Sequence, residues 1–150
     1  MEANPPAQVL TRDEDILALA RSLRRVAVLG IKTEAQSDQP AFYVPEYLAR
    51  AGVEVIPVPV YYPDAKEILG QPVFRKVADI TGPVDLVDVF RRPSDLDAHV
   101  DDLIAAKPAA VWLQSGIRSD PFAAKLVAAG ITVVQDRCLM VEHRRAVARR

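Results

Sequence analysis

The sequence predicts a single-domain α/β protein in which a parallel sheet of about five strands lies between two layers of helices. Short apolar segments of strand length alternate with longer segments whose apolar residues recur at helical spacing. The short segments are continuously apolar, which is typical of parallel strands that are buried on both faces. Strands that alternate with helices in this way form a doubly wound, three-layer αβα fold with right-handed crossovers.

The N-terminal part is predicted to contain a flexible arm followed by a helix. Residues 1–10 are polar and contain two prolines, so we assign them to the arm and residues 11–150 to the folded domain. The segment Thr11-Arg-Asp-Glu14 has the pattern of a capping box. It precedes apolar residues at helical spacing, which predict an amphipathic helix over 13–23.

The next segments predict a strand, a helix and a second strand. Residues 26–29 are apolar and form the first strand. After a polar loop, Pro40 suits the first position of a helix, and Gly52 suits its C-terminal cap. Residues 53–58 then form a second strand, which should end near its prolines because proline cannot donate to the ladder.

The remainder of the chain repeats this alternation. Residues 60–72 predict a loop, and residues 76–80 predict a short helical turn. Ser94 is expected to cap the helix after the third strand, and Ser119 or Asp120 the helix after the fourth. The other predicted elements are strands over 85–90, 109–113 and 131–134 and a final helix over 138–147.

Open α/β sheets bind ligands at the carboxyl ends of their strands, at the point where the strand order reverses. We expect the strands, numbered along the chain, in the order 3-2-1-4-5, which places this point between the first and fourth strands. Residues that directly follow the predicted strands are therefore candidates for a binding site.

Composition excludes several classes of protein. The chain has 150 residues, a formal net charge of -1 and one cysteine. It therefore has no overall basic field for nucleic acid and no internal disulfide, and a reducing cytoplasm is its expected location. No apolar run approaches the roughly 20 residues that a membrane span needs. No Cys/His cluster has metal-ligand spacing, and no Ser–His–Asp or paired-carboxylate set indicates a catalytic centre.

The strand, loop and helix start over 26–40 form a corner of the kind that binds anions, because a helix N-terminus offers free N–H groups. The corner lacks G-x-G-x-x-G and no carboxylate ends the second strand, which argues against NAD; the phosphate loop GxxxxGK[ST] is also absent. Lys32 and Ser37 are candidates for contact with phosphate. The alternative is a solvated loop in which Ser37 or Asp38 only caps the helix.

Several segments, in order, resemble a known family: VAVLGIK, SDQPAFYVPEYLARAGVEVIPV, VDLVDVFRRP, VWLQSGI and VVQDRCLMVEH. They resemble the small stand-alone CoA-binding proteins, and the resemblance runs from about residue 25 to residue 142. The fold of that family is similar to the CoA-binding domain of the succinyl-CoA synthetase α subunit. The resemblance implies a Rossmann-like, nucleotide-binding fold with coenzyme A, or an acyl-CoA, as the ligand.

The resemblance also implies a set of CoA-binding positions at or after strand ends. The loop after the first strand would meet the phosphates, the end of the second strand would line the nucleotide, and the third and fourth strands would each supply a wall. The implied residues are Gly30, Ile31, Lys32 and Ser37; Pro57 and Val58; Val89, Phe90 and Arg91; and Gln114, Ser115 and Gly116. The family continues its second strand as Pro-Val-Asn-Pro, whereas this chain has Pro59 and Val60 in the last two positions and so lacks the amide side chain.

Individual side chains leave alternatives open. One of Arg91 and Arg92 is expected to contact a phosphate of CoA, the alternative being a surface pair with Asp88 or Asp95. Cys138, after the fifth strand, is either a small buried thiol or faces the CoA thiol, with which it would form a mixed disulfide.

The function that these observations favour is a non-catalytic module that binds CoA or an acyl-CoA. The alternatives are a component of an acyl-CoA ligase or of a nucleotide-dependent oxidoreductase that acts with a partner, and a regulatory protein that senses CoA. Trp112 is expected in the core, and His99 and His143 are expected to be solvated. We expect no binding to nucleic acid or membrane, whereas a protein partner or a homo-oligomer stays open.

Overall fold

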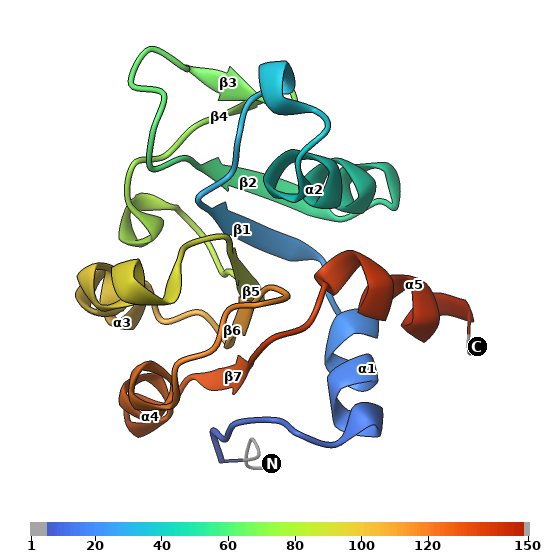
Figure 1. Ribbon diagram of the computed structural model, residues 1–150, viewed down its shortest axis with the longest axis vertical. Coiled ribbons are helices and arrows are strands. Elements are labelled where there is room, and N and C mark those ends of the chain that lie inside the picture. The colour runs from blue at the N-terminus through green and yellow to red at the C-terminus, as the bar shows by residue number, and fades with distance from the viewer. Residues whose placement is uncertain (1–5, 149–150) are drawn as a thin grey trace.

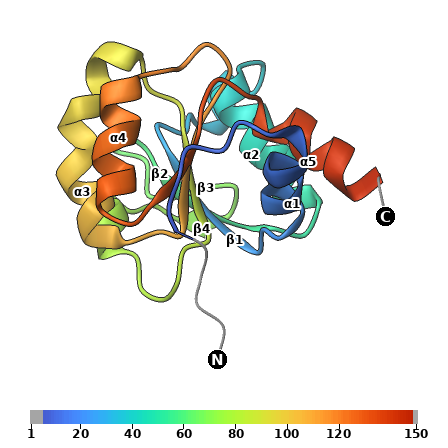
Figure 2. The ribbon, with the colours of Figure 1, turned by 90° about the horizontal axis from the view of Figure 1, so that it is seen from below.

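The computed structural model describes residues 6–148 as a five-stranded parallel sheet covered by helices on both faces. The sheet has the order β2 (Glu54–Val58), β1 (Arg25–Leu29), β5 (Leu86–Val89), β6 (Ala110–Leu113) and β7 (Thr132–Val134). On one face lie α1 (Asp13–Arg21), α2 (Pro40–Arg50) and α5 (Leu139–Ala148), and on the other lie α3 (Val100–Ala106) and α4 (Asp120–Ala128) (Figures 1 and 2). The predicted three-layer, Rossmann-like α/β fold is confirmed.

The predicted strand order, 3-2-1-4-5, is wrong. The third long strand along the chain, β5, pairs directly with β1, from Val26 opposite Leu86 to Leu29 opposite Val89. The five strands therefore follow the order 2-1-3-4-5, and the reversal lies between β1 and β5. Both orders are doubly wound, and apolar patterning cannot distinguish them because it does not encode which edge of β1 the third strand joins.

Alternate residues of each strand pack into two separate apolar layers, one on each face of the sheet. Val26 and Val28 of β1 pack with α1, α2 and α5, whereas Ala27 and Leu29 pack with α3 and α4. Trp112 is fully buried, and its indole Nε1 donates a 2.7 Å hydrogen bond to the carbonyl of Arg137. The prediction that Trp112 belongs to the core is confirmed.

Helix termini match the predictions at some positions and contradict them at others. Pro40 begins α2, and Ser119 caps α4 by accepting a hydrogen bond from the N–H of Phe122. Thr11 does not cap α1, because Arg12 occupies the N-cap position and makes no side-chain capping bond. Ser94 does not cap α3 either, because it lies inside a 3₁₀ helix, Pro93–His99, that precedes α3.

The segment after β2 contains a small hairpin where the sequence predicts a loop. Strands β3 (Glu67–Ile68) and β4 (Gln71–Pro72) pair antiparallel, with the positive φ of Gly70 between them. The hairpin buries Ile68 fully and lies beyond β2 at the edge of the sheet (Figure 1). The predicted turn near residue 78 is a 3₁₀ helix, Val77–Asp79, whose first N–H groups donate to the Asp102 carboxylate.

The last residues of the predicted N-terminal arm lie alongside β7. Val9 forms a parallel bridge with Val133, and the N–H of Leu10 donates to the carbonyl of Val133 at 2.9 Å. The beginning of the predicted arm, residues 1–5, lies outside the described residues. Among residues 6–148, no helix is long and apolar enough to cross a membrane.

Candidate functional site

A cavity of about 510 Å³ opens at the carboxyl edge of the sheet, between the first turns of α2 and α5. The loops after β1, β5 and β6 form its floor, next to the point where the strand order reverses. Its lining is mainly apolar and aromatic, with a few polar groups, as in many small-molecule sites. The lining residues are Lys32, Gln39, Pro40, Ala41, Tyr43, Val44, Phe90, Gln114, Ser115, Ile117, Cys138, Met140 and Val141.

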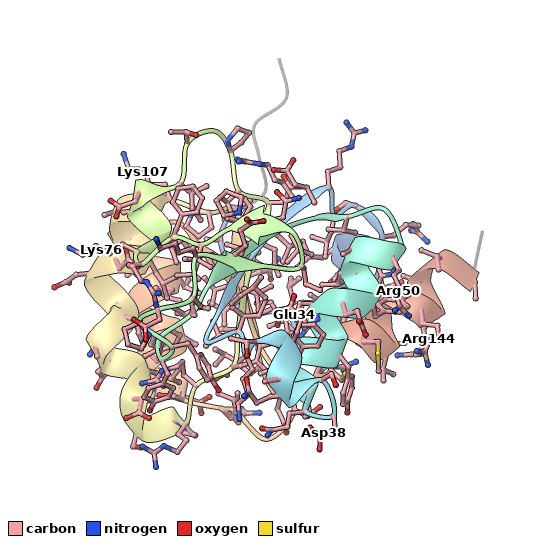
Figure 3. All side chains as sticks on the ribbon, turned by 90° about the horizontal axis from the view of Figure 1, so that it is seen from above. Glu34, Asp38, Arg50, Lys76, Lys107 and Arg144 are labelled. Carbon is pink, nitrogen blue, oxygen red and sulfur yellow. The ribbon has the colours of Figure 1, made fainter. Side chains whose placement is uncertain are left out.

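The structure brings together five of the residues that the sequence nominates for binding. Those that line the cavity are Lys32, Phe90, Gln114, Ser115 and Cys138. The side chains of Ile31, Pro57, Val58 and Val89 are buried in the core beneath, and Ser37 and Gly116 are exposed on neighbouring loops. The neighbouring Asp38 lies at the outer margin of the molecule, and Glu34 lies on a short turn next to the β3–β4 hairpin (Figure 3).

Gly30 allows the loops after β1 and β5 to approach each other closely. Its φ of +87° lies in the left-handed region, and a Cβ at this position would lie 2.4 Å from the carbonyl oxygen of Phe90. The backbone on both sides is fixed, because the N–H of Gly30 donates to Val58 and that of Phe90 donates to Leu29. Only glycine fits this position without moving Phe90, which lines the cavity.

Lys32 supplies the cation among the described residues that line the cavity. Its ammonium group donates to Oε1 of Gln39, just before α2, and its backbone N–H donates to the carbonyl of Ala41 at 3.1 Å. The positive ends of the α2 and α5 dipoles also lie at this cavity, because the first residues of both helices line it. The cavity therefore combines one cation with two helix N-termini, which favours an anionic ligand.

Gln114 is fixed at the floor of the cavity by a hydrogen bond that leaves its donor free. The residue is 4% exposed, and its Oε1 accepts the N–H of Leu139 at 2.8 Å. That bond identifies the amide oxygen, so Nε2 is the atom that remains to donate. Among residues 6–148, Nε2 has no hydrogen-bond partner, although Gln114 lines the cavity.

Arg91 belongs to a second polar cluster, outside the cavity lining. Its guanidinium lies 5.5 Å from the Tyr61 ring centroid, 3.2 Å from Nε2 of His99 and 3.6 Å from the Asp95 carboxylate. Arg92 also pairs with Asp95, at 3.0 Å. The pairing with Asp95 that the sequence offered as an alternative is thus present for both arginines.

Both histidines are less exposed than the sequence predicted. His99 is partly buried against Arg91, and its pKa is lowered, mainly by burial and also by the neighbouring guanidinium. His143 is 6% exposed; its Nδ1 bonds the Tyr47 hydroxyl at 2.8 Å, and burial lowers its pKa. Helical spacing alone did not indicate that these histidines are buried, because the burial of a helix face depends on which neighbouring element covers it.

Sequence reasoning offered Asp88 only as an alternative surface partner of Arg91 or Arg92, and this alternative is wrong because Asp88 is buried and pairs with neither arginine. This carboxyl lies on β5 between Val28 and Trp112 of the neighbouring strands, is fully buried, and has no hydrogen-bond partner among the described residues. Burial raises its pKa well above the usual range, which favours the neutral acid. The sequence signal that could have indicated its burial is the position of this carboxylate inside the apolar segment DLVDVF. Among residues 6–148, no group of acidic, His or Cys side chains is arranged to hold a metal ion.

Comparison with known proteins gives a family match across most of the chain. A family model described as a CoA binding domain matches residues 24–144. The Bacillus subtilis protein YneT, described as uncharacterized, is 30% identical over 129 residues, which cover 86% of this chain and 92% of YneT. The residues that the family model matches include the loops that form the cavity.

Solved structures share this fold over almost their full lengths. A Thermus thermophilus protein, cell-free ID.343, is 42% identical and superposes with a TM-score of 0.81, covering 91% of this chain and 99% of its own. A hypothetical protein from Pyrococcus horikoshii OT3 is 31% identical, with a TM-score of 0.80 and coverage of 98% and 99%.

Proposed function

Since this chain belongs to the CoA binding domain family, we propose that it binds coenzyme A or an acyl-CoA at the carboxyl edge of its sheet, as a binding module without chemistry of its own. The observation that carries the proposal is the cavity between α2 and α5. Its volume of about 510 Å³ lies within the range of small-molecule sites. Its charge and its apolar walls suit different parts of one CoA molecule.

The proposed ligand has two chemically distinct parts. Phosphate groups carry the negative charge, and the pantetheine arm carries two amides and ends in a thiol. Lys32 and the N-termini of α2 and α5 suit the phosphates, because they offer positive charge without a competing carboxylate in the described lining. Phe90, Val44 and Met140 offer apolar contact to the arm.

In this proposal, most of the other predicted binding residues contribute by shaping the backbone around the ligand. Gly30, Ile31, Pro57, Val58, Val89 and Gly116 shape the loops at the strand ends. Arg91 and Tyr61 lie on the same edge of the sheet, after β5 and β2, and offer a guanidinium and an aromatic ring to the nucleotide part. To bind a phosphate, Arg91 would exchange its contact with Asp95 for the ligand.

Calorimetry tests this proposal with CoA, acetyl-CoA, NAD and ADP as separate ligands. The expected result is binding of CoA or acetyl-CoA and weaker or no binding of NAD. Lys32→Gln should weaken CoA binding about tenfold, because a charge-assisted hydrogen bond contributes about 1.5 kcal/mol or more.

Lys76→Gln is the matched control. It removes the same charge from an exposed position next to α3, on the opposite side of the molecule from Arg50 of α2 and Arg144 of α5 (Figure 3). CoA binding should be unchanged in this variant. Absence of heat with both CoA compounds would contradict the proposed function.

A further inference from the structure

We propose that Cys138 is a covalent capture site for coenzyme A, at which the disulfide form of CoA exchanges to give a mixed disulfide with the protein. This inference rests on the proposed function, because it places the thiol end of CoA beside this cysteine. Beyond the proposed binding of CoA, the inference names a site of covalent modification and the class of reactant that modifies it, a CoA disulfide.

The position of Cys138 meets the geometric requirement for such an exchange. The residue is partly exposed and lines the cavity together with Met140 and Val141 of α5. It directly precedes α5, and its carbonyl accepts the N–H of Glu142 at 3.0 Å. The sulfur therefore lies at the positive end of a helix dipole, where the negative charge of an attacking sulfur is favourably placed.

Gln114 is the independent observation that points to a ligand at this cysteine. Its carboxamide is held by the N–H of Leu139, the residue that follows Cys138, and both Gln114 and Cys138 line the cavity. The Nε2 group is a fixed donor without a partner among residues 6–148, in a residue that is 4% exposed. A donor held at the cavity in this way suits an acceptor on a ligand, and the amide carbonyls of pantetheine provide one a short distance from the thiol.

The exchange is balanced without any additional oxidant. The Cys138 sulfur loses its proton and attacks one sulfur of the CoA disulfide. A new S–S bond joins Cys138 to one CoA, and the old S–S bond breaks. The second CoA leaves as a thiolate and takes up a proton, so each step is a thiol–disulfide exchange.

Intact-protein mass spectrometry tests this inference directly. Reduced protein, freed of reductant, is mixed with CoA disulfide or, in parallel, with glutathione disulfide at the same concentration. The expected product is one CoA adduct per chain that a thiol reductant removes. Because the chain has a single cysteine, the adduct identifies its own site, and Cys138→Ser should give none.

The comparison of the two disulfides distinguishes a cysteine in a CoA-binding site from a cysteine that reacts with any disulfide because it is accessible. Recognition in the cavity should make the reaction with CoA disulfide at least about tenfold faster than that with glutathione disulfide, because binding raises the local concentration of the reacting sulfur. Equal rates would overturn the inference, as would the absence of a CoA adduct or a product that is only a disulfide between two copies of the chain.

Gln114→Glu tests the positioning role of the amide. It keeps an acceptor for Leu139 but removes the donor, so the ratio of the rate with CoA disulfide to the rate with glutathione disulfide should fall about tenfold. The rate with glutathione disulfide reports what the added negative charge alone does to the thiol. An unchanged preference in a folded Gln114→Glu protein would contradict this role.

Calorimetry with reduced CoA, performed on the wild-type protein with reductant present, distinguishes the two proposals. If reduced CoA binds and no adduct forms, only the capture inference fails. If neither binding nor an adduct is observed, the proposed function fails as well.

Discussion

At the scale of single residues, Gly30 is a position where an added methyl group would disturb both the fold and the site. We expect Gly30→Ala to destabilise the protein by about 2–5 kcal/mol, because the left-handed backbone costs about 1–2 kcal/mol and the contact with the Phe90 carbonyl adds an overpacking cost. Urea unfolding measures the change, and CoA binding should weaken in parallel because Phe90 must move.

Gly52→Ala provides the control for this substitution. Gly52 has a similar φ of +93°, yet nothing lies within 4 Å of a Cβ placed there. Gly52→Ala should therefore lose only the stability that the left-handed backbone conformation costs an alanine, about 1–2 kcal/mol. Equal losses of stability in the two variants would show that the contact with Phe90 contributes nothing.

His143 predicts a pH dependence of stability. Burial lowers its pKa in the folded protein, whereas the unfolded chain has the ordinary value near 6.5. As the pH falls, the unfolded chain therefore binds a proton at His143 before the folded protein does. The contribution of neutral, buried His143 to stability is complete above about pH 6.5 and is lost as the pH falls toward the pKa of the folded protein. The free energy of unfolding should decrease between about pH 7 and 5.

His143→Gln should flatten that decrease without abolishing it. Glutamine can still bond the Tyr47 hydroxyl but does not titrate, and His99, whose pKa is also lowered, remains in the variant. Denaturant unfolding of both proteins at several pH values measures the difference. Parallel curves for variant and wild type would rule out a contribution from His143.

The sequence predicted the site residues best where they directly follow a strand. Lys32, Phe90, Gln114 and Ser115 line the cavity because the carboxyl ends of parallel strands share one edge of the sheet. Tyr43 and Val44, which also line it, were missed. They lie within a helix, and their direction depends on how α2 packs rather than on local pattern.

At the scale of elements, α1 is tied to α5 by a network of four charged side chains. Glu142 is almost fully buried and accepts from Arg137 and Arg145, each at 2.9 Å, and Asp13 of α1 accepts from the same two guanidinium groups. The Arg145 guanidinium lowers the pKa of Asp13. This network fixes the start of α5, which directly follows Cys138 and forms one wall of the cavity.

Glu142→Gln should therefore destabilise the protein by about 1–3 kcal/mol, because it leaves two cations partly unpaired next to a buried position. Glu46→Gln is the matched control. Within residues 6–148, its carboxylate pairs only with the exposed Arg50, at 3.5 Å, so its loss should change stability by less than about 0.5 kcal/mol. A loss for Glu142→Gln no larger than that for Glu46→Gln would contradict a structural role for the network.

Most elements could be predicted from the sequence, because long apolar segments and helix-terminal prolines are strong local signals. Strand β1 and helix α2 begin within one residue of their predicted positions. The β3–β4 hairpin was missed because two-residue strands leave no periodicity to detect. The caps at Thr11 and Ser94 were wrong because a capping residue is defined by backbone geometry as well as by its side chain.

At the scale of the whole molecule, the strand order determines where a ligand meets the sheet. With β5 next to β1, the reversal lies between these two strands, and the loops that carry Lys32 and Phe90 are neighbours. The predicted order would have separated them. Pairing between distant strands follows from the packing of the whole chain, which is why local pattern identified the strands but not their order.

The most direct test of CoA binding at this edge is a crystal structure of the protein grown with CoA under reducing conditions. We expect electron density for CoA at the carboxyl ends of β1, β5 and β6, with its phosphates near Lys32 and its thiol beside Cys138 in the cavity between α2 and α5. Density for CoA elsewhere on the molecule, or an empty cavity at saturating CoA, would contradict the proposed site.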